Sequence, residues 1–117
     1  MRENIILKKT MDFAIRIVDL YKYLTGEKKE YIMSKQLLKC GTSIGANVYE
    51  AVKGQSRNDF LSKIYISFKE TSETEYWLKL LTSTAYLNEA QSASILNDCR
   101  EISRILSSII KTTKEHS

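Results

Sequence analysis

The sequence predicts an all-α protein, folded as one domain over residues 1–117 into an antiparallel up-down-up-down four-helix bundle. The chain has no proline and only four glycines, so it lacks most of the residues that tight β-turns require. Apolar residues recur at spacings of three and four along four stretches, which is the period of an amphipathic helix. Short connections join these stretches and make consecutive helices antiparallel neighbours. The expected helices cover residues 5–25, 30–52, 57–87 and 89–112.

The first expected helix has an apolar face that is wider than a coiled-coil seam requires. Gly26 ends this helix, and the polar residues 27–30 form the turn that follows. Two neighbouring stripes make up the face: Met11, Ala14, Val18 and Tyr21 on one, and Phe13, Ile17, Leu20 and Leu24 on the other.

In the second expected helix, Gly41 and Gly45 lie four positions apart beside the apolar stripe. Small residues at this spacing let another helix backbone approach closely. A kink or a loosely wound turn is the alternative, because two glycines cost a helix about 2 kcal/mol relative to alanine. The two readings are compatible. The stripe itself consists of Met33, Leu37, Cys40, Ile44, Val48 and Ala51.

Capping residues mark the starts of the last two helices. Ser56 is a candidate N-cap with Asp59 in the capping-box position, and Asn88 is a candidate N-cap with Gln91 as its reciprocal partner. The tail after residue 110 is polar, and we expect it to fray. The third helix carries Leu61, Ile64, Phe68, Thr71, Glu75, Leu78, Thr82 and Ala85, a stripe that turns polar in its middle; the fourth carries Ile95, Cys99, Ile102, Leu106 and Ile109.

Composition indicates a soluble protein of the cytoplasm. No apolar run approaches the roughly 20 residues that span a bilayer. Cys40 and Cys99 lie in apolar stripes, where we expect buried, reduced thiols. The net charge of +4 is unevenly placed: residues 1–63 hold twelve Lys and Arg against seven Asp and Glu, and residues 64–117 hold six against seven. The basic first half is consistent with a phosphate-bearing partner, and equally with the small excess of lysine that is common on solvated helix faces.

Surplus apolar residues at the edges of the core stripes predict self-association, because gathered into one patch they would form an interface. These residues are Ile6, Tyr23, Tyr65, Tyr76, Leu81, Ile105 and Ile110.

The segment 36–47, Gln-Leu-Leu-Lys-Cys-Gly-Thr-Ser-Ile-Gly-Ala-Asn, is followed by Glu50-Ala51, Asp59-Phe60 and the run Glu73-Thr-Glu-Tyr-Trp-Leu78. In this order the motifs resemble the bacterial four-helix-bundle family, also called the 23S rRNA intervening-sequence protein or S23 family, from about Asn4 to Thr112. Gly45 replaces the proline of many members, and Ala51 replaces a glycine. The resemblance implies an antiparallel four-helix bundle, related proteins that form five-fold rings, and distant relatives that bind nucleic acid as accessories to reverse transcriptases.

Polar residues on the second and third helices form the candidate core site. A ferritin-like di-metal site would need Glu-x-x-His histidines, but the only histidine is His116 in the tail. No nucleophile, base and orienting group occur together, so we expect no enzyme activity, no cofactor, no metal and no small-molecule substrate. Acid–base chemistry by paired carboxylates, such as Glu50 with Glu73, is the alternative. Instead we expect a structural role, in which Asn47 bonds to Thr71 or Glu75 across the core and fixes the helix register. The set comprises Gln36, Ser43, Asn47, Glu50, Thr71, Glu73, Glu75 and Trp77.

Trp77 and Tyr76 have two interpretations. They can form a base-stacking platform, or one core ring and one interface ring, and the second is the commoner arrangement for adjacent aromatics on a helix.

The expected function is that of a non-enzymatic, self-associating bundle. The resemblance implies that the assembly is a pentameric ring and that it binds RNA or DNA as an accessory protein. A protein–protein scaffold without a nucleic-acid role is the alternative. A ring would repeat a modest basic patch and so strengthen weak phosphate contacts. The residues to test for nucleic acid are Lys35, Lys39, Lys53, Arg57 and Lys63.

Overall fold

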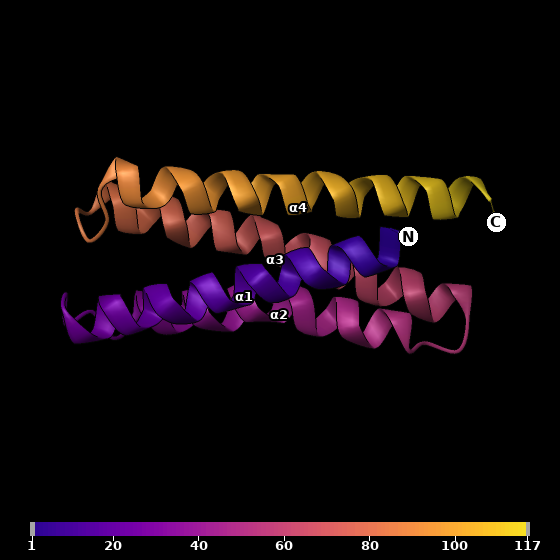
Figure 1. Ribbon diagram of the computed structural model, residues 1–117, viewed down its shortest axis with the longest axis horizontal. Helices are drawn as coiled ribbons and strands as arrows, with labels where there is room; N and C mark the ends of the chain where they lie inside the picture. The colour runs from indigo at the N-terminus through magenta and orange to yellow at the C-terminus, as the bar shows by residue number, and fades with distance from the viewer. Residues whose placement is uncertain (1, 117) are drawn as a thin grey trace.

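Four helices run alternately up and down along a rod that measures 47 × 21 × 19 Å (Figure 1). The computed structural model describes residues 2–116, and it describes side chains from residue 5. Each helix packs against the next along the chain, and α1 closes the bundle by packing on α4. This arrangement confirms the predicted antiparallel four-helix bundle. The helices are α1 (Arg2–Gly26), α2 (Met33–Val52), α3 (Arg57–Ser83) and α4 (Glu89–Glu115).

Both ends of the described chain lie at the same end of the rod as the turn between α2 and α3 (Figure 1). Arg57, at the start of α3, donates a hydrogen bond of 2.6 Å from its Nη1 atom to the carbonyl oxygen of His116, just past α4. The turns from α1 to α2 and from α3 to α4 occupy the opposite end.

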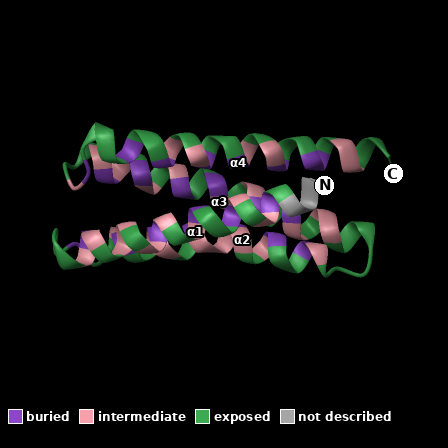
Figure 2. Ribbon diagram, in the orientation of Figure 1, coloured by how far each residue is buried: buried purple, intermediate pink, exposed green. Residues whose placement is uncertain are grey.

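The core follows the predicted stripes of α2 and α4, whose buried residues recur about every three or four positions. In Figure 2 the buried segments of α4 lie on its side toward α3. On α1, Phe13, Ile17 and Leu24 are buried as predicted, whereas Met11 is 51% exposed. The stripe that contains Met11, Ala14, Val18 and Tyr21 therefore lies at the edge of the core.

Hydroxyl groups occupy much of the buried face of α3. Ser67, Thr71 and Thr74 are buried between Ile64 and Leu78, and each hydroxyl donates to a backbone carbonyl. The bond from Ser67 crosses to the carbonyl of Ile44 on α2, with a length of 2.7 Å. Because these side chains are short and satisfied, α3 lies close against α2, and this pair makes the most extensive helix contact in the bundle.

The two glycines of α2 face α1, as their spacing predicts. A Cβ atom at Gly41 would lie 2.8 Å from Cγ1 of Ile17, and one at Gly45 would lie 3.2 Å from the carbonyl oxygen of Thr10. α2 is helical throughout Met33–Val52. The glycines therefore serve close packing within a continuous helix.

The boundary of α2 differs from the prediction because Glu30 caps the helix instead of beginning it. The Glu30 carboxylate accepts from the backbone N–H groups of Ile32, Met33 and Ser34 at 3.1, 3.0 and 2.7 Å. The Ser34 hydroxyl donates in return to the carbonyl oxygen of Glu30. These bonds satisfy donors that the first turn of a helix leaves without partners.

The end of α3 also differs, because the helix stops at Ser83 rather than at residue 87. Ala85 has a φ of 69°, in the left-handed region. Its N–H bonds to the carbonyl of Thr82, and the N–H of Tyr86 bonds to that of Leu81. This is a Schellman motif with alanine at the position that glycine usually fills.

The predicted caps of the last two helices are present. The Ser56 hydroxyl accepts from the N–H of Asp59, and Asn88 and Gln91 form a full capping box. α1 begins earlier than predicted, at Arg2, and α4 continues through Glu115, where we expected a frayed tail.

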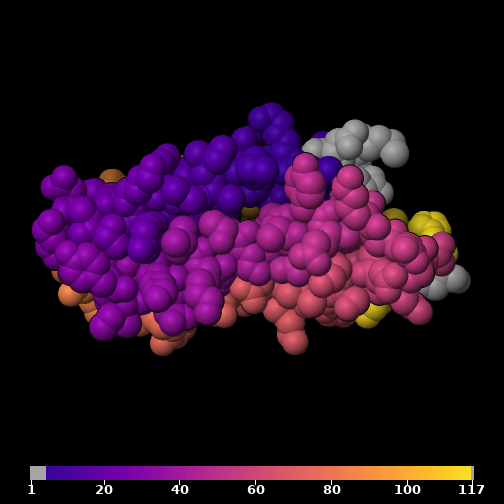
Figure 3. Space-filling view, turned by 90° about the horizontal axis from the view of Figure 1, so that it is seen from below, coloured from indigo at the N-terminus to yellow at the C-terminus, as the bar shows by residue number. Residues whose placement is uncertain are grey.

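The predicted surplus apolar patch does not form. Ile6, Leu81 and Ile110 are core residues, and Tyr23 and Ile105 are half-buried against the core. Exposed apolar side chains lie elsewhere, among them Met11, Ile15 and Tyr49 on α1 and α2. These two helices run side by side along the face seen in Figure 3.

Candidate nucleic-acid interface

The five basic residues that the sequence singles out lie at two ends of the molecule. Lys35 and Lys39 are exposed in the first turns of α2 and share a face there. Lys53, Arg57 and Lys63 lie around the turn between α2 and α3. Because the rise along α2 from Lys35 to Lys53 is about 27 Å, the structure does not bring the five residues into one patch.

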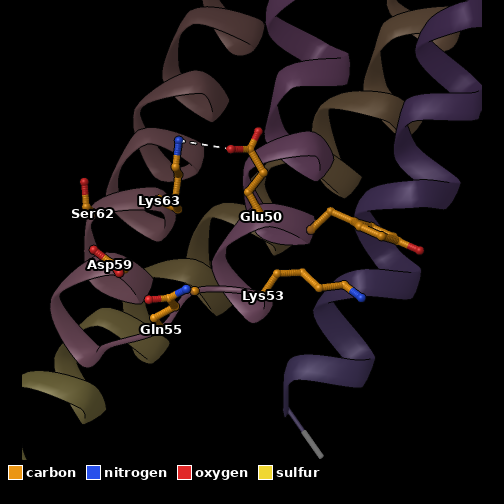
Figure 4. A pocket seen from close by; sticks show the side chains of 8 residues that line it. Glu50, Lys53, Gln55, Asp59, Ser62 and Lys63 are labelled. Atoms are coloured by element: carbon orange, nitrogen blue, oxygen red, sulfur yellow. Dashed lines mark ion pairs between the residues drawn. The ribbon is translucent and has the colours of Figure 1, made fainter.

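An open cleft of about 460 Å³ lies between the end of α2 and the start of α3 (Figure 4). Lys53 and Lys63 line it together with Glu50 and Asp59. Lys63 points to Glu50, with 3.1 Å between its Nζ atom and a carboxylate oxygen, while Lys53 extends away from this pair. Two carboxylates beside two ammonium groups leave the cleft with little net charge, so it offers a phosphate little attraction.

The predicted hydrogen bond across the core does not form. The Asn47 amide donates to the carbonyl oxygen and the hydroxyl of Ser43, each at 2.9 Å, one turn earlier in the same helix. Thr71 donates to its own helix, at the carbonyl of Phe68, and Glu75 pairs with Arg100 on α4. The prediction was wrong because a short amide on a helix finds partners one turn away.

The other members of the predicted polar set lie on the flanks of α2 and α3. Gln36 is partly buried and Glu50 is exposed. The carboxylate of Glu73 accepts from the indole nitrogen of Trp77 at 3.1 Å, within α3. Burial raises the pKa of the neighbouring Glu70 carboxyl, and the charge of Glu73 adds to this effect.

Trp77 and Tyr76 divide as one core ring and one exposed ring. Trp77 is partly buried and packs against the hydrophobic core, whereas Tyr76 is 57% exposed. Their ring centroids lie 5.0 Å apart with planes at 80°, an edge-to-face contact that fixes the Tyr76 ring.

A basic surface that the sequence analysis missed lies on the outward side of α3 and α4. It contains every lysine and arginine after position 63, and all six side chains are exposed. Along each helix their spacings place them on one side. We call this surface the outer basic face, and its residues are Lys69, Lys79, Arg100, Arg104, Lys111 and Lys114.

Three of the seven carboxylates in the same half of the chain point elsewhere. Asp98 and Glu101 face α1, where they pair with Arg16 and Lys9. Glu70 lies on a side of α3 away from α4, by its helical position. The net charge of residues 64–117 is slightly negative, yet its two signs are partly separated in space.

The outer basic face contains cations with and without partners. Arg100 donates to Glu75 at 2.6 Å, and Lys79 lies 4.0 Å from the same carboxylate. Lys114 donates to the Tyr65 hydroxyl at 3.1 Å and lies 5.0 Å from the centroid of that ring.

Three cations of this face, Lys69, Arg104 and Lys111, form no ion pair with any described residue. The carboxylates on its side of the molecule are Glu75, Glu89 beside Lys79 and Arg100, Glu115 at the end of α4, and Glu73, one turn from Lys69. The cations therefore outnumber the carboxylates by six to four.

A small polar hollow of about 190 Å³ opens in the middle of this face. Arg100 and Arg104 line it beside the hydroxyl residues Ser72 and Ser103, together with the Glu75 carboxylate, which accepts from Arg100. Guanidinium groups bind phosphate oxygens through paired hydrogen bonds, and hydroxyls supply further donors. The hollow thus presents two guanidinium groups and two hydroxyls to a phosphate, beside one carboxylate.

An apolar groove of about 220 Å³ lies on the other hairpin, between α1 and α2. It opens beside the close approach of Gly45 to Thr10. Met11 and Tyr49 line the groove and are more than half exposed. No charged residue lines it. The remaining lining residues are Leu7, Ala14, Thr42 and Ala46.

The described part of the chain lacks a cluster of metal ligands and a helix that could span a membrane. No group of three or more His, Cys, Asp or Glu side chains is placed to hold a metal ion there. None of its helices is both long enough and apolar enough to cross a bilayer.

Fold and surface together define a class, the small antiparallel four-helix bundles with a basic face. Residues 2–108 match the family described as 23S rRNA-intervening sequence protein. The chain belongs to that family, which confirms the resemblance drawn from its motifs.

A crystal structure of a protein of unknown function from the S23 ribosomal protein family of Bacteroides thetaiotaomicron is similar to this chain. The two are 54% identical and superpose with a TM-score of 0.93, over 95% of this chain and 99% of the other. The comparison with curated proteins gives no significant match.

Proposed function

We propose that this protein is a non-enzymatic helical bundle that binds RNA or DNA through the phosphate backbone and assembles with copies of itself. The outer basic face carries the proposal. Six exposed cations on two adjacent helices, opposed by four carboxylates, give a local potential that attracts a polyanion. The family description, which refers to 23S rRNA, is consistent with an RNA-related role.

The test is salt-dependent binding of a labelled oligonucleotide to the triple variant Lys69→Gln, Arg104→Gln, Lys111→Gln. These three side chains make no ion pair with a described residue, so their replacement removes charge and leaves the helix contacts intact. We expect affinity to fall about tenfold or more and the slope of log K against log salt to fall by about 2, because each phosphate contact contributes roughly 0.7 to 0.9.

The matched control removes the same charge from elsewhere, through Lys35→Gln, Lys39→Gln and Lys53→Gln. This control also tests the basic residues first suggested by the sequence. If both triple variants bind equally weakly, net charge alone controls binding and the outer basic face has no special role. If the unaltered protein binds no oligonucleotide at low salt, the nucleic-acid proposal is wrong.

The apolar groove between α1 and α2 supports self-association as the second part of the proposal. An uncharged, largely apolar groove beside two half-exposed side chains suits an apolar partner surface. We propose a second copy of this chain as its occupant, with a five-membered ring as the first assembly to test. Should nucleic acid fail to bind, a protein–protein scaffold built on this groove becomes the better account.

Light scattering on Ala46→Glu tests the groove, because the exposed Ala46 lines it and a buried carboxylate would oppose association. We expect the mass to fall to that of a monomer with an unchanged helical circular dichroism spectrum. Ile32→Glu is the control, since Ile32 is 78% exposed and lies outside the groove. An unaltered protein that is already monomeric contradicts self-association.

A further inference from the structure

Two exposed tyrosines lie on the outward side of α3, in line with a cation of the outer basic face. Tyr65, Lys69 and Tyr76 are separated by four and seven residues, spacings that place side chains on one side of a helix. Tyr65 is 41% and Tyr76 is 57% exposed. The rise along α3 between the two tyrosines is about 16 Å, with Lys69 between them.

Both rings are held in place by neighbours. The edge-to-face contact with Trp77 supports Tyr76, and Trp77 itself is fixed by the core and by its bond to Glu73. The ammonium of Lys114, on α4, lies over the Tyr65 ring. Rings that are ordered before binding lose little side-chain entropy when a ligand stacks on them.

The cations of α4 run parallel to this row of rings. Arg100 reaches α3 at Glu75, beside Tyr76, and Lys114 reaches it at Tyr65. Arg104 and Lys111 lie between these two points on the same side of α4. The face therefore has a row of rings on one helix and a row of cations on the next, about 8–10 Å away, the usual spacing of packed helices.

Accordingly, we propose that the outer basic face binds a single-stranded segment of RNA or DNA, with bases stacked on Tyr65 and Tyr76 and phosphates on the cations of α4. This inference rests on the proposed function and names the form of nucleic acid that the same surface takes. Unpaired bases expose the flat faces that aromatic side chains stack on, and a duplex hides them inside its helix. A duplex would use the cations and leave both tyrosines without a role.

Fluorescence anisotropy with labelled probes of about 12 nucleotides tests the inference: oligouridylate, oligothymidylate, and an RNA duplex of the same length. We expect both single strands to bind more tightly than the duplex. Tyr76→Leu should weaken single-strand binding about fivefold or more, because it keeps apolar bulk against Trp77 and removes the flat ring. Duplex affinity should stay unchanged, and Tyr76→Phe should bind like the unaltered protein.

Tyr31→Leu is the matched control, since Tyr31 is a similarly exposed tyrosine in the turn before α2, outside the outer basic face. Tyr65→Leu is the second test variant and should act in the same direction as Tyr76→Leu. Equal or tighter duplex binding, or Tyr65 and Tyr76 variants that bind single strands normally, would overturn this inference and leave the proposed function standing. Failure of all three probes to bind at low salt would overturn both.

Discussion

At the residue scale, Gly41 shows most directly how one side chain sets the distance between two helices. Its missing Cβ leaves room for the buried Ile17 of α1, whose Cγ1 and Cγ2 would lie 2.8 and 2.9 Å from a methyl group there. Both clashing atoms are attached to the β-carbon of Ile17, so they cannot move away without a change of rotamer or a shift of the helix.

We predict that Gly41→Ala lowers the free energy of unfolding by about 1–2 kcal/mol, because overpacking outweighs the gain in helix propensity of about 1 kcal/mol. Urea titration measures the change. Gly26→Ala is the control, since a Cβ there meets nothing within 4 Å and its φ is not positive, so it should stabilise the protein. In an Ile17→Ala background, Gly41→Ala should itself become stabilising; persistent destabilisation there would refute the clash as the cause.

Glu30 is a second single residue on which the stability of the fold depends, because its buried carboxylate caps α2. Burial by itself would raise its pKa, but the hydrogen bonds from the N–H groups of Ser34, Met33 and Ile32 outweigh burial and hold the pKa below the usual value. A carboxyl with a lowered pKa in the folded state stabilises the fold above the pKa of the unfolded chain. That contribution is lost as pH falls through the folded value.

We predict that Glu30→Gln costs about 2 kcal/mol at pH 7 and removes part of the acid sensitivity of the protein. The difference between the two proteins should shrink as pH falls below about 4.3, the usual glutamate value. Chemical denaturation at several pH values measures this. Glu27→Gln, in the exposed part of the same turn, should change little; an equal effect there would mean that the cap is not responsible.

At the element scale, α3 ends in a left-handed alanine where most helices of this type have glycine. The Cβ of an L-residue is strained in that conformation, whereas glycine adopts it freely. The hydrogen bonds of the Schellman motif and the burial of Leu87 after it hold Ala85 in place.

We predict that Ala85→Gly raises the free energy of unfolding by about 0.5–1 kcal/mol, measured as a rise in Tm or in urea midpoint. Ala93→Gly, at an exposed site inside α4, is the opposite control and should destabilise by about 1 kcal/mol. If Ala85→Gly lowers the free energy of unfolding as Ala93→Gly does, the left-handed conformation of Ala85 does not strain the native protein.

The elements whose signals are local could be predicted from the sequence, and the elements decided by tertiary contacts could not. The caps at Ser56 and Asn88 depend on residues three positions away, and both were predicted. The start of α2 was predicted too early, because the Glu30 side chain lies before the helix and accepts hydrogen bonds from the N–H groups of its first turn. The end of α3 was missed because the apolar pattern continues to Leu87, which is buried in the turn without being helical.

The polar core residues and the basic surface were likewise predicted only in part. Buried hydroxyls such as Ser67 and Thr74 carry no apolar signal, so the core line of α3 was only partly predicted. The outer basic face was missed because charge was averaged over half the chain. The spacing of Arg100, Arg104 and Lys111, with Asp98 and Glu101 on another side of the helix, was the signal that could have revealed it.

At the scale of the whole molecule, the two hairpins present different surfaces. α1 and α2 expose an apolar groove, and α3 and α4 expose the outer basic face. Copies that associate through α1 and α2 would keep their basic faces turned away from the contact. Repeated faces on one particle strengthen weak binding to a long polymer without any new contact.

The two cysteines report on the integrity of the whole bundle. Burial raises the pKa of Cys40 to about 11 and that of Cys99 to about 12. We predict that neither thiol reacts with a disulfide reagent at pH 8 in the native protein, and that both react in denaturant. Ser94→Cys, at an exposed position, is the control and should react at once. Rapid reaction of one native thiol would reveal local opening around it.

The contact between α1 and α4 is the least extensive of the four helix contacts. Two partly exposed ion pairs, from Lys9 to Glu101 and from Arg16 to Asp98, join these helices at their outer edge. Salt screens the attraction within such exposed ion pairs, whereas the extensive interface between α2 and α3 depends on buried groups and is little affected by salt. Transient opening is therefore expected to begin with the separation of α1 from α4, while α2 and α3 remain packed together. An opened chain could then receive the first helix of a neighbour, so concentrated samples at high ionic strength are where exchanged, domain-swapped dimers should be sought.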